Sequence, residues 1–158
     1  MTGTSGNAAL YFVDRHRTGP VSGKAAFVEA GSAGRTLSYE QLAAQSDRMA
    51  ALYARHGLRP EDRAIMLVLD QIEFPVIFWG SLKAGVIPVP LNTLLSAELY
   101  HAILMDSRAR ALFVSSELLP AVAPALKGNP YLQAIFVVGQ PPAETGAPAF
   151  GRLLPFDV

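Results

Sequence analysis

The sequence contains no cysteine, which excludes disulfide bonds, thiolate metal sites and cysteine nucleophiles. It also lacks any run of eighteen or more uninterrupted apolar residues, although 51% of its 158 residues are hydrophobic, so we expect no membrane-spanning helix and no membrane partner. Residues 1–7 have neither the basic nor the apolar region of a secretory signal. These absences together predict a cytoplasmic protein.

Neither sign of charge is in excess, because thirteen Lys and Arg residues balance thirteen Asp and Glu residues. A chain without net charge has no overall electrostatic attraction to nucleic acid. We therefore expect no nucleic-acid partner. The length allows either one domain with its own core or a piece of a larger domain.

The N-terminal region begins with a predicted short helix. Asn7 can cap a helix that continues to about Arg17. We expect Leu10, Phe12 and Val13 to be its apolar contacts.

A hairpin and a long helix are predicted next. Residues 25–37 have the composition of two short strands joined by a turn at 31–34. Ser38 and Gln41 have the spacing of a capping box, so a long helix should begin after Ser38. Its C-terminal end is expected at Gly57, where a left-handed glycine can end a helix.

The rest of the chain alternates between strand and helix patterns. Strands are expected at 64–69, 86–89, 111–114 and 134–138, and helices at 74–84, 96–107 and 118–126. The first of these strands has no polar alternation, which is typical of a parallel strand covered on both faces. The alternation predicts an α/β fold: a doubly wound, mostly parallel sheet with flanking helices.

The segment around Pro88 and Pro90 predicts an edge strand, because each proline removes an N–H from the sheet ladder. Gly85 should end the preceding helix in the left-handed conformation. Asn92 and Thr93 would then follow the carboxyl end of this strand, on the side of an open α/β sheet where ligands bind.

No motif in the sequence predicts a catalytic, cofactor-binding or metal-binding residue. The glycine-containing segments 2–6 and 31–34 lack the following helix or lysine of a phosphate loop. His16, His56 and His101 match no metal-binding or catalytic spacing. We interpret the two segments as a flexible terminus over 1–6 and a hairpin turn.

Charged residues gather at one helix-to-strand transition, at Asp106, Arg108 and Arg110. Charges at such a position usually mark a solvated corner. A ligand-binding arginine is the alternative interpretation. From Gly139 the composition turns to Pro, Ala and Gly, which predicts a loop over 139–149.

Two segments resemble core motifs of the adenylate-forming acyl- and aryl-CoA synthetases. Residues 37–42 read LSYEQL and residues 82–92 read LKAGVIPVPLN, similar to the first and second core motifs of that superfamily. Residues 7–16 (NAALYFVDRH), 92–95 (NTLL) and 106–111 (DSRARA) are similar to the benzoate–CoA ligase branch. The likeness spans nearly the whole chain.

The resemblance implies an acid–thiol ligase that uses ATP, magnesium and coenzyme A. A carboxylate would attack the α-phosphate of ATP, and the thiol of coenzyme A would then displace AMP from the acyl-adenylate. The acid would be benzoate or a substituted benzoate. The alternatives are a fatty-acyl or other acyl-CoA synthetase, and a non-catalytic binding domain that shares the framework.

The resemblance also implies that residues 1–158 are the N-terminal portion of the large domain of such an enzyme. The phosphate loop ending in Pro-Lys, the ribose-binding aspartate motif and the small C-terminal domain of the family are absent from the sequence. The two core motifs are mainly framework in the family, so no residue is carried over as catalytic. Lys83 in particular does not match the family's catalytic lysine.

We therefore expect this N-terminal fragment to be inactive by itself and to bind no cofactor. Its partners would be the remainder of the parent chain and, through it, a small aromatic carboxylate. A homodimer is kept open as an assembly state.

Overall fold

The structure is a computed structural model that describes residues 6–30, 34–140, 153–156 and 158. Its chain divides into two compact units. Unit 1 consists of Met1–Pro60, Asp70–Val86 and Val158, and unit 2 of Glu61–Leu69 and Ile87–Asp157. Most of the predicted flexible terminus (1–5), the predicted turn residues 31–33 and most of the predicted loop (141–149) lie outside the described residues.

Unit 1 begins with two short helices instead of the single helix predicted to reach Arg17. Helix α1, Ala8–Phe12, is capped by Asn7, whose side-chain oxygen accepts the N–H of Ala9 at 2.9 Å. The 3₁₀ helix η1, Asp14–His16, follows. The prediction of one continuous helix was therefore wrong.

The break between α1 and η1 lies at Val13, whose φ of −116° departs from the α-helical value. This turn buries the β-branched side chain of Val13 to 1% exposure, as the sequence predicted. Leu10 and Phe12, the other two predicted contacts, are instead 43% and 54% exposed. Of these three predicted contacts, Val13 is therefore the one that is buried.

The predicted hairpin is confirmed, because β1, Ala25–Val28, pairs antiparallel with β2, Thr36–Ser38. Helix α2, Tyr39–Arg55, begins with the predicted capping box. The N–H of Gln41 donates to the Ser38 hydroxyl at 3.2 Å, and the N–H of Ser38 donates to the Gln41 side-chain oxygen at 2.9 Å. Two N–H groups that the helix leaves free are satisfied in this way.

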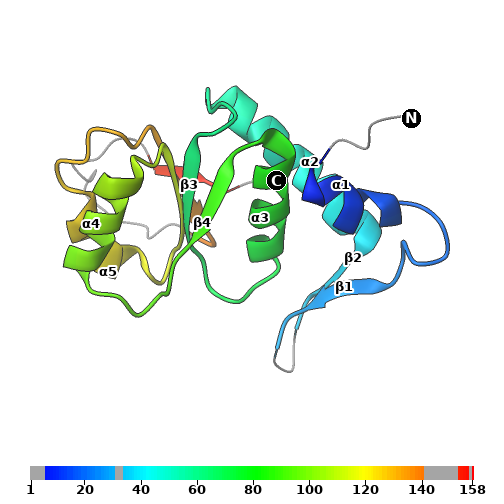
Figure 1. The fold of residues 1–158 in the computed structure, drawn as a ribbon. Coiled ribbons are helices and arrows are strands. Elements are labelled where there is room, and N and C mark those ends of the chain that lie inside the picture. The colour runs from blue at the N-terminus through cyan, green and yellow to red at the C-terminus, as the bar shows by residue number, and fades with distance from the viewer. Residues whose placement is uncertain (1–5, 31–33, 141–152, 157) are drawn as a thin grey trace. The chain divides into compact units, whose positions relative to one another are not determined.

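Helix α3, Glu73–Ala84, packs along α2 (Figure 1). Gly80 allows the two helices to come close, since a Cβ built there would lie 2.4 Å from the Cβ of Met49. The hydroxyls of buried Tyr53 and Ser81 share a hydrogen bond of 2.6 Å between the same two helices. Burial raises the pKa of Tyr53, so its hydroxyl stays neutral.

Gly85 ends α3 with a left-handed φ of 73°, which confirms the predicted helix stop. Its N–H donates to the carbonyl of Leu82 at 3.1 Å. A Cβ at this position would lie 3.1 Å from the Cβ of Pro60. Both the backbone angle and the neighbouring ring therefore favour glycine.

Unit 2 is a five-stranded parallel sheet with the strand order β4-β3-β5-β6-β7. The strands are β3, Arg63–Leu67; β4, Ile87–Pro90; β5, Ala111–Ser115; β6, Ala134–Val138; and β7, Leu153–Pro155. The chain adds β4 on one side of β3 and then β5 on the other. This reversal of strand order belongs to a doubly wound sheet, and the predicted α/β fold class is confirmed.

Strand β4 forms an edge of this sheet, as its prolines predicted. The N–H groups of Ile87 and Leu91 donate to the carbonyls of Asp62 and Met66 at 2.8 and 3.0 Å. Pro88 and Pro90 occupy the alternate positions, where an N–H would point away from the sheet. The prolines thus cost no ladder bond and leave the outer edge a poor template for another strand.

Helices cover one face of the sheet in unit 2 (Figure 1). They are α4, Ala97–Ser107; α5, Leu119–Val122; and the 3₁₀ helix η2, Ala123–Leu126. The single helix predicted for 118–126 is divided, because Pro124 has no N–H to continue the α-helical ladder. The core beneath them includes Ile65, Leu67, Tyr100, Leu104, Leu112, Val114, Ile135 and Val137.

Side chains on the alternate positions of the strands are buried as well. Phe113 and Phe136 are fully buried, and their rings stack with centroids 4.7 Å apart. Every residue of β5 and β6 is buried. In β3 the last four residues are buried, as the apolar run at 64–69 predicted. No helix in the described ranges is both long enough and apolar enough to span a membrane.

We predict that Gly85→Ala lowers the thermal midpoint of the chain more than Gly57→Ala. Both glycines have a φ of 73°, which costs an L-residue about 1 kcal/mol. Only the Cβ at position 85 meets a neighbour, Pro60. Gly85→Val should cost the most, because a β-branched side chain fits this conformation worst.

Gly23→Ala is the matched control, since Gly23 has no positive φ and no atom within 4 Å of its built Cβ. Calorimetry of the four variants separates backbone strain from the contact with Pro60. A midpoint for Gly85→Ala equal to that of Gly23→Ala would contradict the assignment of a helix-stop role to Gly85.

Candidate functional site

The carboxyl edge of the parallel sheet is the candidate ligand side of unit 2. The loop after β4 is held there by Tyr100 of α4, a side chain only 2% exposed. Its hydroxyl donates to the carbonyl of Asn92 at 3.0 Å and accepts the N–H of Leu95 at 3.3 Å. Asn92 lies beyond the strand end, as predicted, and its side chain accepts the N–H of Leu94 at 2.8 Å. This loop is therefore fixed by internal hydrogen bonds.

A serine hydroxyl joins two strands where the strand order reverses. The fully buried Ser115 accepts the N–H of Leu69 at 3.0 Å through its side chain, which links the ends of β5 and β3. The hydroxyl of Ser116 donates to the Glu117 carboxylate at 3.1 Å. A Cβ at Gly139, where φ is 94°, would lie 2.8 Å from that hydroxyl. The carboxyl edge of the sheet is thus formed by backbone and hydroxyl groups that are hydrogen-bonded and tightly packed. The residues named here include no acid–base pair.

Lys83 has a structural environment in unit 1. Its side chain is 7% exposed, and its ammonium contacts Asp14 at 2.5 Å and Asp47 at 2.7 Å. A third donor reaches the carbonyl of Ala43 at 3.1 Å. Burial raises the pKa of Asp47, but the hydrogen bonds from Lys83 and Arg17 outweigh it and leave that pKa below its usual value. All three ammonium protons of Lys83 are therefore engaged in holding α3 to its neighbours.

The three histidines lie on three different elements. His16 of η1 accepts a hydrogen bond from Arg15 at 2.9 Å and lies against the ring of Tyr39. His56 is the C-cap residue of α2. His101 of α4 contacts the carbonyl of Ala125 at 2.9 Å through Nδ1. In the described part of the chain, no group of three or more His, Asp or Glu side chains could hold a metal ion.

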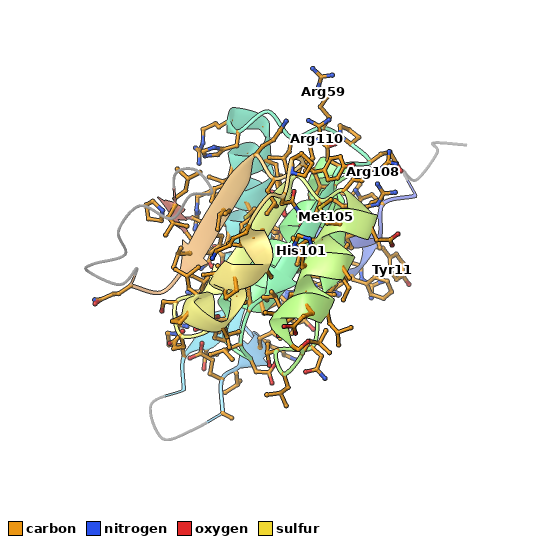
Figure 2. The ribbon with its side chains drawn as sticks, turned by 90° about the vertical axis from the view of Figure 1, so that its left-hand side faces the viewer. Tyr11, Arg59, His101, Met105, Arg108 and Arg110 are labelled. Atoms are coloured by element: carbon orange, nitrogen blue, oxygen red, sulfur yellow. The ribbon has the colours of Figure 1, made fainter. Side chains whose placement is uncertain are left out.

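Arg108 and Arg110 lie where α4 leads into β5, at the amino end of the sheet (Figure 2). Arg108 ends α4 with a φ of 50°, and its guanidinium lies 5.9 Å from the ring centroid of Tyr131. Arg110 pairs with Asp62 at 3.4 Å. Asp106 is exposed on the helix. This end is opposite to the carboxyl edge, and Asp106, Arg108 and Arg110 are all exposed, as expected for a solvated corner.

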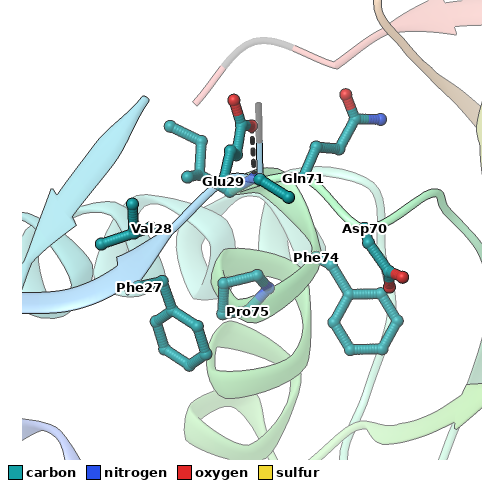
Figure 3. A pocket seen from close by; sticks show the side chains of 9 residues that line it. Phe27, Val28, Glu29, Asp70, Gln71, Phe74 and Pro75 are labelled. Carbon is teal, nitrogen blue, oxygen red and sulfur yellow. Dashed lines mark hydrogen bonds between the residues drawn. The ribbon is translucent and has the colours of Figure 1, made fainter. Parts of the chain in front are cut away.

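A cavity of about 300 Å³ lies within unit 1, between β1 and the start of α3 (Figure 3). Its walls are formed by Phe27 and Val28 on one side and by Phe74 and Pro75 on the other. Asp70 contributes a carboxylate to the lining. The sequence did not predict this cavity.

An ion-pair cluster of Arg35, Glu29 and Glu73 fixes one side of the cavity. Arg35 donates to Glu29 at 2.5 and 3.0 Å and to Glu73 at 2.6 and 2.8 Å. Glu29 also accepts the N–H of Ile72 at 2.9 Å. The Arg35 hydrogen bonds, and then the one from Ile72, lower the pKa of Glu29 from 4.5 to about 2. Glu73 lies 38 residues from Arg35 in the sequence, so no local pattern could have revealed the cluster.

Comparison with known proteins decides the family. The model of the AMP-binding enzyme family matches residues 14–153, which take in most of both units. The chain belongs to the AMP-binding enzyme family. This result confirms the resemblance carried by the motifs at 37–42 and 82–92.

Relatives of this AMP-binding chain include ligases for aromatic and fatty acids. It is 42% identical over 139 residues, 88% of its length, to the 4-hydroxybenzoate–CoA/benzoate–CoA ligase of Rhodopseudomonas palustris, of which it covers 25%. It is 40% identical over 89 residues, 56% of its length, to a fatty acid–[acyl-carrier-protein] ligase of Streptomyces coeruleorubidus, of which it covers 17%.

A solved structure is similar to this chain over most of its length. The benzoate CoA ligase from Burkholderia xenovorans LB400 superimposes with a TM-score of 0.74 and 34% identity, over 85% of this AMP-binding chain and 26% of that one. The chain thus spans about a quarter of the length of the benzoate ligases that it matches.

We predict that Lys83→Met lowers the free energy of unfolding by roughly 2 kcal/mol, because two carboxylates lose their cation and one carbonyl loses its donor. Urea unfolding of the AMP-binding chain measures this loss. Lys24→Met is the control, since Lys24 is exposed and has no ion pair within the described residues. Equal losses for both variants would contradict the structural role of Lys83.

A second prediction concerns acid stability. Because the folded pKa of Glu29 is about 2 and its ordinary value is 4.5, its ionised form stabilises the fold above pH 4.5. That contribution is lost as the pH falls from 4.5 through 2. Glu29→Gln should therefore flatten the fall of the thermal midpoint in this window. Glu40→Gln, at an exposed position of α2, should keep the wild-type slope; an unchanged slope for Glu29→Gln as well would rule out the linkage.

Proposed function

We propose that this chain is the N-terminal part of an ATP-dependent aryl-CoA ligase. The reaction joins benzoate or a substituted benzoate to coenzyme A and converts ATP to AMP and pyrophosphate. One observation carries the proposal: the benzoate ligase matches nearly nine-tenths of the chain, whereas the fatty-acid ligase matches little more than half. The proposal places the enzyme in the cytoplasm, where ATP and coenzyme A are available.

The chemistry of such a ligase has two steps. A carboxylate oxygen attacks the α-phosphorus of ATP, an acyl-adenylate forms and pyrophosphate leaves. The thiol sulfur of coenzyme A then attacks the carbonyl carbon of the adenylate, and AMP leaves with the electron pair of the broken C–O bond. Both steps need groups that stabilise negative charge on phosphate oxygens.

In this proposal magnesium and the phosphates of ATP are held by other parts of the enzyme. Within the described residues no cluster of carboxylates and histidines could hold a metal ion, and the ammonium of Lys83 is occupied by Asp14, Asp47 and a carbonyl. We therefore assign to this chain no step of the reaction. Its role in the proposal is the sheet and its fixed carboxyl edge, on which the remainder of the enzyme builds the site.

A fatty-acyl or other acyl ligase is the second candidate, favoured by the 40% identity with the fatty-acid relative. The two candidates differ in the acid and not in the role of this chain. A homodimer is compatible with either and is measurable by light scattering.

The complete reading frame tests the proposal. We predict that a phosphate loop ending in Pro-Lys follows the sequence shown here. The encoded protein should form aroyl-CoA from benzoate or 4-hydroxybenzoate with a kcat/KM at least about a hundredfold above that for decanoate, since only a matched pocket is filled by an aromatic ring. A preference for decanoate would favour the acyl-CoA synthetase, and absence of adenylate formation with every acid would favour a binding domain.

The 158-residue chain by itself is the control. We expect it to form no adenylate and to bind neither ATP nor benzoate, because it offers no preorganised charge for the α-phosphate. A micromolar site for either ligand in a calorimetric titration would contradict this expectation.

A further inference from the structure

We propose that the cavity between β1 and α3 in unit 1 binds a small organic cation, a primary ammonium carried on an aromatic or other apolar group. The cavity has about 300 Å³, the lower end of the size range of small-molecule sites. All of its lining residues belong to unit 1.

The walls of the cavity suit an apolar ligand. Figure 3 shows the ring of Phe27 beside Pro75, and the carboxylate of Asp70 beside the ring of Phe74. Phe27 is 41% exposed and Val28 is 66% exposed, so this wall presents apolar surface that a ligand can cover. Among the described residues neither Phe27 nor Phe74 makes a ring contact with another aromatic side chain.

The charge of the cavity selects a cation. Its ionisable lining residues are Glu29 and Asp70, and neither lysine nor arginine lines it. Glu29 is engaged by Arg35 and by the N–H of Ile72. Within the described ranges the carboxylate of Asp70 has no hydrogen bond and no ion pair. Asp70 is therefore the carboxylate available to a ligand.

A carboxylate next to aromatic rings favours an ammonium group with an apolar body. The ammonium can pair with Asp70 while also lying over the face of Phe74, where the ring quadrupole attracts it. An anion is repelled by both carboxylates. The cavity is consequently unsuited to the carboxylate acid, ATP or coenzyme A of the proposed reaction, and it forms a separate site.

The Arg35 cluster keeps the cavity preformed. It joins Glu29, next to the wall residues of β1, to Glu73, next to the wall residues of α3, through four charge-assisted hydrogen bonds. Because both walls are fixed before a ligand arrives, little conformational entropy is lost on binding. The cavity therefore does not need to close around its ligand.

The test titrates the protein of the complete reading frame with 2-phenylethylammonium, followed by ligand-observed NMR. We expect saturable binding in the millimolar range, as is usual for a ligand of this size. 2-Phenylethanol, with the same ring and chain but no charge, should bind about tenfold more weakly. Phenylacetate, the anion, should show no binding.

Variants locate the site. Asp70→Asn should lower the affinity for 2-phenylethylammonium about tenfold, to that for 2-phenylethanol. Asp106→Asn removes an exposed acid of unit 2 and should leave both affinities unchanged. Phe27→Ala, at an exposed position, should lower the affinity for both probes. Equal binding of both probes to the wild type, an unchanged affinity in Asp70→Asn, or no saturable binding at all would overturn the proposal.

Benzoate separates this proposal from the ligase function. Excess benzoate should leave the affinity for 2-phenylethylammonium unchanged, and competition between them would overturn the claim of a separate site. Asp70→Asn should form aroyl-CoA at the wild-type rate. If the wild-type protein binds the cation but forms no aroyl-CoA, the ligase proposal is rejected and the cation-site proposal stands.

Discussion

Strand β3 pairs in parallel with β4 on one side and with β5 on the other. The way in which the chain divides into its two units depends on this pairing. Parallel neighbours cannot be joined by a tight turn, so the chain must leave the sheet after β3 and return for β4. The segment that makes this connection contains α3, which packs with α2 in unit 1. For this reason unit 1 consists of two main segments separated by a strand of unit 2.

Helix α3 is held to the first sixty residues at both of its ends. Near its start, Glu73 pairs with Arg35, and Ile72 donates to Glu29. Near its end, Lys83 pairs with two aspartates, and the side-chain amide of Asn7 donates to the carbonyl of Leu82 at 2.6 Å. An acid at the start and a lysine at the end also complement the helix dipole. Residues distant in sequence thus fix the orientation of one connecting helix within its unit.

Lys83, Arg17 and Arg35 are engaged in such structural pairs, and this bears on function. Chemistry on ATP needs charges that remain available to phosphate oxygens. The carboxyl edge of the sheet instead presents hydroxyls and backbone groups that bond to one another, as at Ser115 and Tyr100. In the proposed ligase, this part therefore supplies a rigid sheet. The cavity near Asp70 differs, because its carboxylate is paired with nothing in the described residues.

Local sequence determined the elements whose cause is local. The Ser38 capping box, the stop at Gly85, the edge position of the Pro88–Pro90 strand and the buried strand at 64–69 could all be predicted, because each depends on the conformational preference or hydrophobicity of neighbouring residues. The motifs at 37–42 and 82–92 likewise identified the family. Tertiary structure alone decided the break at Val13 and the partners of Lys83 and Arg35. It also decided the cavity, since β1 and the start of α3 are some forty residues apart and only folding brings Phe27, Asp70 and Phe74 to one place.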